Sequence, residues 1–87
     1  MNVEQITDRV REFIRTEFDV PATDREFTDD VHLFDYGYVD SFGAVALTAF
    51  VEQTFAVKVT QSDLIAHPMN TIREIATFIN RRRAGEI

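Results

Sequence analysis

The sequence predicts an all-α fold, a small four-helix bundle of three longer helices and one short helix. Apolar residues recur at helical spacing in the three longer segments, and N-cap residues precede the last three expected helices. No segment shows a β pattern of comparable strength, although "AVKVT" can be read as a few extended residues. The chain has 87 residues, enough for one modest core, so a single domain over residues 1–87 is expected.

The first helix is expected at the amino end of the chain, running to about Glu17. Its apolar positions are Val3, Ile6, Val10, Phe13 and Ile14, with charged residues between them. The pair Val20-Pro21 favours a stop here, because a residue that precedes proline is disfavoured in the α region.

A long loop is expected between the first and second helices, ending at Asp40. Its acidic residues are Asp19, Asp24, Glu26, Asp29, Asp30, Asp35 and Asp40. Its apolar residues lack a sustained period and are expected to pin the loop to the core: Val20, Phe27, Val31, Leu33 and Phe34. A short turn is expected around Asp30 to Phe34. Unstructured connections longer than about 12–15 residues are uncommon unless they are functional.

The second helix is expected to begin at Asp40 as its N-cap and to run to about Phe55. It carries two apolar stripes. One consists of Leu47, Val51 and Phe55, and the other of Phe42, Val45 and Ala49. Two alternatives follow: either the helix is covered all round, or one stripe lies at the surface as a contact patch.

The third helix is expected to be short, beginning at Thr60 and passing through Leu64 and Ile65, with Asp63 completing a capping box. Pro68 helps to end it. The last helix should begin at Thr71, where Thr71 and Glu74 form a stricter capping pattern, and run to about Arg82. Its apolar positions are Ile72, Ile75, Ala76 and Ile79.

Composition excludes several function classes. The net charge of −6 opposes binding to nucleic acid or to an anionic membrane, and no apolar segment is long enough to insert into one. The chain has no cysteine and is too short for a deep active-site cavity, so we expect neither a thiolate metal site nor an enzyme. Asp29, Asp30, His32 and His67 match no metal-ligand spacing. A cytoplasmic monomer is the expectation.

Ser41 is the residue whose position best suits a chemical role. A helix-start serine commonly has no chemistry, and as a nucleophile Ser41 lacks a G-x-S-x-G elbow and has only His32 and His67 as candidate bases. A hydroxyl at the positive end of a helix, however, tolerates an attached phosphate. Ser41 therefore suits modification better than attack.

The chain resembles an acyl or peptidyl carrier protein, which carries phosphopantetheine on the serine of a D-S-[LMF] motif. Here the motif is "DSF", Asp40 to Phe42, at the start of the second of four helices. The resemblance extends through "LFDYGYVDSF", "FVEQTF" and "DLIAHPMNTIREIATFI", and so covers nearly all of the chain.

This resemblance implies that Ser41 carries 4′-phosphopantetheine, delivered from coenzyme A by a phosphopantetheinyl transferase. The protein would be a phosphoprotein that holds substrates as thioesters and catalyses nothing itself. Asp40 would cap the helix beside the attachment site. The implied partner-facing residues are Phe42, Val45, Ala49 and, in the acidic loop, Asp35. Further implied partners are an adenylating acyl or aminoacyl ligase and a downstream transferring enzyme.

Two departures refine the resemblance. Gly43 and Ala46 stand where carriers of the fatty-acid type usually place acids, so docking is expected to be more apolar. The string "GYVDSF" is similar to D-alanyl and other free-standing carriers, which favours an amino-acid or specialised acyl cargo over a fatty-acid or polyketide role. The rival hypothesis is an unmodified helical interaction module that uses the stripe Phe42, Val45 and Ala49.

Overall fold

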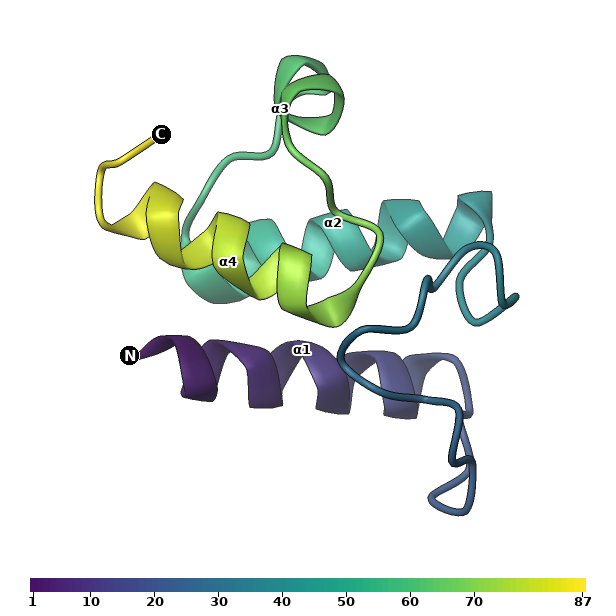
Figure 1. Cartoon of the computed structure of the whole chain (residues 1–87). Helices are drawn as coiled ribbons and strands as arrows, with labels where there is room; N and C mark the ends of the chain where they lie inside the picture. The colour runs from purple at the N-terminus through teal and green to yellow at the C-terminus, as the bar shows by residue number, and fades with distance from the viewer.

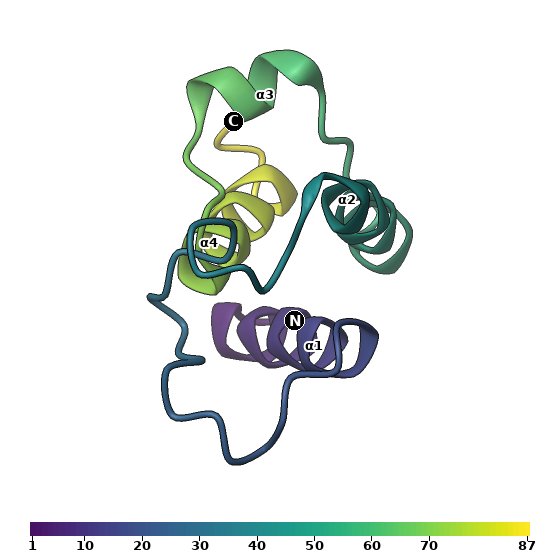
Figure 2. The same cartoon turned by 90° about the vertical axis from the view of Figure 1, so that its right-hand side faces the viewer.

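The computed structural model describes residues 1–87 and contains four helices and no strand. The helices are α1 (Val3–Glu17), α2 (Ser41–Phe55), α3 (Gln61–Ala66) and α4 (Ile72–Arg83). Figure 1 shows α2 and α4 running opposite to α1. In Figure 2, α1 lies on one side of α2 and α4, and the short α3 lies on the other. The predicted bundle of three longer helices and one short helix is confirmed.

Local capping explains where the helices begin. The Asp40 side chain caps α2 as expected, and Thr60 and Asp63 form the expected capping box of α3. The expected box at α4 is only half formed, because the Glu74 side chain accepts from the N–H of Asn70 at 3.0 Å rather than from Thr71. An unexpected capping box, made by Asn2 and Gln5, begins α1.

The core lies between α1, α2 and α4. Most of the predicted apolar positions are buried, and the fully buried side chains are Ile6, Val10, Ile14, Leu33, Ile72 and Ile79. Two assignments on α1 need correction, since Val3 is 41% exposed and Phe13 is only partly buried. Val3 lies in the first turn of α1, while Phe13 stacks on Phe50 of α2 with ring centroids 4.1 Å apart.

The long loop is pinned to the core by its apolar residues, as predicted. Val20, Phe27 and Leu33 are buried, and Val31 packs partly against the core. Phe34 was predicted to do the same but is 36% exposed. Turns lie at Asp29 and Asp30 and again from Leu33 to Gly37, so both ends of the segment expected to turn, Asp30 to Phe34, do so. Gly37 with φ +77 adopts the left-handed conformation that favours glycine. The Phe34 side chain lines an apolar pocket together with residues of α2 and α3.

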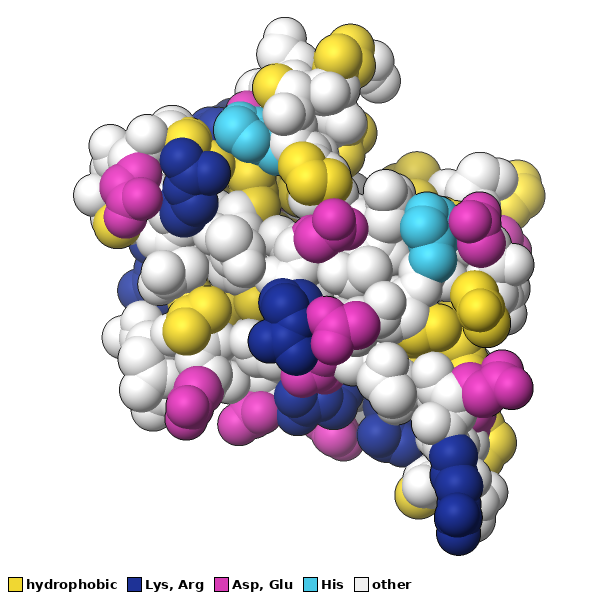
Figure 3. Space-filling model, viewed as in Figure 1, with side chains coloured by type: hydrophobic (Ala, Val, Ile, Leu, Met, Phe, Trp, Pro, Cys, Tyr) yellow, Lys and Arg dark blue, Asp and Glu magenta, His cyan; other side chains and the backbone are white.

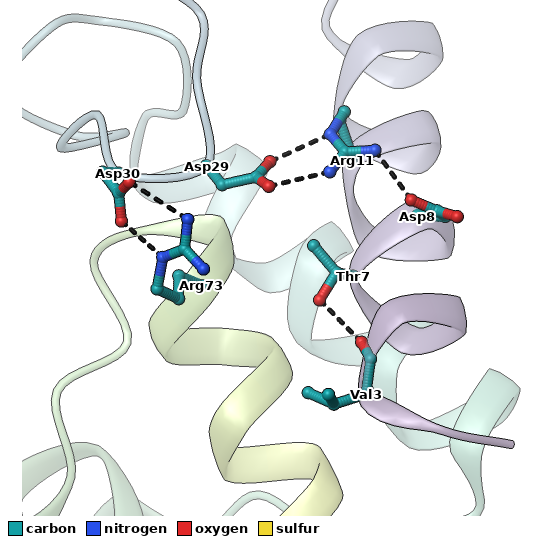
Figure 4. Close-up of polar contacts among 7 residues, drawn as sticks. All are labelled: Val3, Thr7, Asp8, Arg11, Asp29, Asp30 and Arg73. Carbon is teal, nitrogen blue, oxygen red and sulfur yellow. Dashed lines mark hydrogen bonds and ion pairs between the residues drawn. The ribbon is translucent and has the colours of Figure 1, made fainter.

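Two adjacent aspartates join the loop to two helices (Figure 4). Asp29 pairs with Arg11 of α1, and Asp30 pairs with Arg73 of α4. Asp29 accepts two hydrogen bonds from the Arg11 guanidinium, at 2.9 and 2.8 Å. Asp30 accepts two from the Arg73 guanidinium, at 2.6 and 3.2 Å. The Arg73 N–H also donates to the Asp29 carbonyl at 3.0 Å. The loop therefore bridges α1 and the start of α4.

The short α3 is held to the bundle by a polar contact from its own capping residue. Asp63 is only 8% exposed and accepts from the Thr60 N–H at 2.9 Å and from the Arg82 guanidinium at 2.5 Å. These donors lower the pKa of Asp63 below its ordinary value, the Thr60 N–H contributing most. The Arg82 guanidinium also lies over the Phe78 ring, 5.1 Å from its centroid.

Replacing Arg11 by alanine should lower the free energy of unfolding by roughly 1 kcal/mol, because a bidentate, partly buried ion pair is lost. Arg9→Ala is the matched control, since Arg9 lies on the same helix, is exposed and forms no ion pair. Urea denaturation of both variants measures the difference. Equal stability of Arg11→Ala and Arg9→Ala would contradict the structural role of the pair.

The Asp63 carboxylate should make stability depend on pH. A carboxyl whose pKa is lowered on folding contributes stability above its unfolded pKa of about 3.9, and this contribution is lost as pH falls through the folded pKa. Asp63→Asn should therefore be less stable than the wild type at neutral pH, with the gap closing below about pH 4. Denaturation between pH 7 and pH 2.5 measures the gap. Glu26→Gln, at an exposed acid without an ion pair, is the matched control.

Candidate functional site

Ser41 is the first residue of α2 and is exposed. The Asp40 carboxylate just before it accepts the Gly43 N–H at 2.7 Å. The N–H groups of Ser41 and Phe42, at the start of the helix, have no intrahelical acceptor. Together with the helix dipole, these free donors favour an anion beside the Ser41 hydroxyl. A phosphate ester fits this position.

The segment that leads to Ser41 is held in place by burial and by hydrogen bonds. Val39 is 2% exposed, and the N–H groups of Tyr38 and Val39 both donate to the Leu33 carbonyl. The Tyr38 hydroxyl donates to the Asp24 carboxylate at 2.8 Å. Burial of the phenol, followed by this hydrogen bond, raises the pKa of Tyr38 to about 12. The exposed residues that follow are therefore presented by an ordered loop.

The two stripes of α2 have opposite environments. Leu47, Val51 and Phe55 are buried, as the sequence predicted. On the other side of the helix, Phe42 is 86% exposed, Val45 is 71% exposed and Ala49 is exposed. The alternative in which α2 is covered all round is wrong. Phe42, Val45 and Ala49, termed here the exposed α2 stripe, form an apolar surface that begins directly after Ser41.

Sequence reasoning did not assign three further exposed apolar side chains. Tyr36 in the loop is 62% exposed, and Leu64 and Ile65 of α3 are 52% and 85% exposed. Figure 3 shows hydrophobic side chains at the surface of α3, at the top of the view. For Leu64 and Ile65, the sequence signal was their adjacency on a six-residue helix, because neighbouring side chains on a helix cannot both face the core.

Asp35 and Asp40 are both exposed, at the end of the acidic loop. The other polar residues considered from the sequence are engaged in structural contacts. His32 Nδ1 accepts the Asp35 N–H at 3.0 Å, and the His67 ring packs against Phe78 with centroids 5.6 Å apart. Neither histidine forms a hydrogen bond with Ser41. The structure thus assembles no nucleophile and base around the serine.

Other kinds of site receive little support from the geometry. No three side chains of the metal-ligating types lie close enough together to hold an ion. No helix has the length and apolar character needed to cross a membrane. An apolar pocket between α2 and α3 measures about 100 Å³, below the 300–1,000 Å³ of ordinary ligand sites. This pocket is therefore too small to hold an ordinary ligand.

Comparison with known protein families gives one finding for this region. A family model described as phosphopantetheine attachment site matches residues 8–79, which include Asp40, Ser41 and the exposed α2 stripe. Comparison with curated proteins gives no significant match.

Proposed function

The chain belongs to the phosphopantetheine attachment site family, and we propose that it is a free-standing acyl or aminoacyl carrier protein modified on Ser41. Domains of this family bind covalently attached 4′-phosphopantetheine and are non-catalytic carriers of thioester intermediates. The observation that carries the proposal is the exposed hydroxyl of Ser41 at the amino end of α2, within the matched region.

Modification attaches the phosphate of phosphopantetheine to the Ser41 oxygen. The oxygen to phosphorus bond forms as the bond to the adenosine bisphosphate half of coenzyme A breaks, and the hydroxyl proton goes to the transferase. Asp40 keeps the first turn of α2 capped beside the new phosphate. The arm supplies a thiol, which this cysteine-free chain lacks. A tethered cargo is presented to each partner at high local concentration.

The exposed α2 stripe is the proposed docking surface for partner enzymes. Leaving a phenylalanine exposed forgoes the roughly 1.5–3 kcal/mol that its burial provides. A partner that covers Phe42 recovers this energy. Asp40 at the start of α2 and Asp35 in the preceding loop, both exposed, supply charge steering toward basic residues of a partner. The proposed partners are a phosphopantetheinyl transferase, an adenylating ligase and a downstream acyl- or aminoacyl-transferring enzyme, all acting in the cytoplasm.

The string "GYVDSF" supports an amino-acid or specialised acyl cargo. Such a cargo is activated by an ATP-dependent ligase before it reaches the arm. We therefore place the chain with the D-alanyl and aminoacyl type of carrier rather than with carriers that extend fatty acids.

Incubation with coenzyme A and a broad-specificity phosphopantetheinyl transferase should add one arm to the wild-type chain, measured by intact-protein mass spectrometry. Ser41→Ala should gain none. Ser62→Ala is the matched control, because Ser62 is the only other serine, is exposed and also lies in the first turn of a helix. It should be modified like the wild type.

An unmodified wild-type chain would refute the carrier function and favour the interaction module. For that module, Ser41→Ala would preserve function in cells while Phe42→Ala abolished it.

Docking should be mainly apolar. Phe42→Ala or Val45→Asp on the modified protein should lower kcat/KM of a loading or transferring partner by roughly tenfold, equivalent to about 1.4 kcal/mol. Gln53→Ala, at an exposed polar position of the same helix, should leave kcat/KM unchanged. Raising salt from 0.05 to 0.5 M, roughly a threefold shorter Debye length, should change the rate little. A steep fall with salt would show that charge dominates docking instead.

A further inference from the structure

Gly43 is an unusual residue at its position. It is the third residue of α2 and is buried, and glycine is less favourable than alanine inside a helix. Gly37 and Gly85 have positive φ angles, but Gly43 does not, so its backbone conformation is open to any residue. Another constraint must therefore account for the missing side chain.

That constraint is the close approach of two apolar side chains. A Cβ atom on Gly43 would lie 2.8 Å from Cε1 and 3.1 Å from Cζ of Phe18, and 3.2 Å from Cγ1 of Val39. Carbon atoms in favourable contact are about 3.5–4.0 Å apart. A methyl group at this position would thus displace Phe18, Val39 or the first turn of α2.

The Phe18 ring is partly buried and is supported on one side by another aromatic ring. Its edge packs against Phe13 with centroids 6.1 Å apart, and Phe13 is itself stacked on Phe50 of α2. The backbone around Phe18 is also held, because the Phe18 N–H donates to the Ile14 carbonyl and the Val20 N–H donates to the Arg15 carbonyl. Phe13 and the hydrogen-bonded backbone therefore support the partly buried Phe18 ring where it lies against the start of α2.

On the other side of Gly43, a displacement of Val39 would also move Ser41. Val39 is buried and hydrogen-bonded to Leu33, and Gly43 donates the N–H that binds the Asp40 carboxylate. Residues 39 and 40 immediately precede Ser41. Any shift that relieves the close contact of a Cβ added at Gly43 would therefore change the Asp40 cap or the orientation of Ser41.

We infer that Gly43 is a positioning residue for modification at Ser41, because its missing side chain lets Phe18 and Val39 hold the Asp40–Ser41 turn in place. The inference deepens the proposed function and rests on it. Phe18 and Val39 share this role, acting on the serine through Gly43 and the Asp40 cap.

The test is a double-mutant cycle on the rate of arm transfer from coenzyme A by a broad-specificity phosphopantetheinyl transferase. Gly43→Ala should lower kcat/KM by roughly tenfold, since misplacement of a reacting group by about 1 Å can cost up to roughly a hundredfold. The effect should fall on kcat more than on KM. Phe18→Leu removes the Cε1 and Cζ atoms, so combining it with Gly43→Ala should restore kcat/KM to within about threefold of Phe18→Leu alone.

A stability control separates positioning from general weakening. Ile6→Val is a modest core change near the amino end of α1, which lies at the opposite end of the bundle from the start of α2 (Figure 1). It should leave kcat/KM unchanged. Normal transfer to Gly43→Ala, or failure of Phe18→Leu to restore it, would overturn the positioning role while leaving the carrier function intact. Failure of the wild type to accept an arm would overturn the proposed function and this inference together.

Discussion

The attachment of the acidic loop to the bundle is the constraint on which the rest of the structure depends. Asp29 and Asp30 are neighbours in a segment crowded with negative charge, yet each faces its own arginine on a different helix. The pair Asp29 and Arg11 is the more shielded, with side chains 22% and 33% exposed, whereas Asp30 and Arg73 are more than 60% exposed. Exposed pairs contribute little, so the Arg11 contact dominates the polar part of this attachment.

The apolar part of the attachment is larger. Leu33 is fully buried and Val39 nearly so, and burying each such side chain stabilises by roughly 1.5–3 kcal/mol. The ion pairs then set where the loop lies, and the buried residues supply most of its stability. Because Val39 is buried and Asp40 caps α2, the serine that follows must emerge at the surface. An ordered loop thus determines the direction in which α2 begins.

Much of this arrangement could be predicted because it is encoded locally. Helix starts depend on residues one to three positions apart, so Asp40 and Thr60 identified the starts of α2 and α3. Local patterns could not reveal the partner of Arg11, which lies 18 residues away in a loop without periodicity. They also left Phe34 misassigned, since its exposure depends on how closely α2 and α3 approach it. Periodicity recognised both stripes of α2, but only the positions of α1 and α4 decide which stripe is covered.

Gly43 shows how one residue can have two separate explanations. Considered as part of a charge pattern, Gly43 stands where fatty-acid carriers usually place an acid, so its lack of charge would affect partner docking. Considered in three dimensions, it faces inward against Phe18, a position where no carboxylate could reach a partner. The steric explanation is stronger, because a Cβ at this position would approach Phe18 and Val39 to 2.8 to 3.2 Å whatever the chain binds. The apolar character of the docking surface must therefore be argued from the outward residues Phe42 and Val45, which are free to vary without disturbing the core.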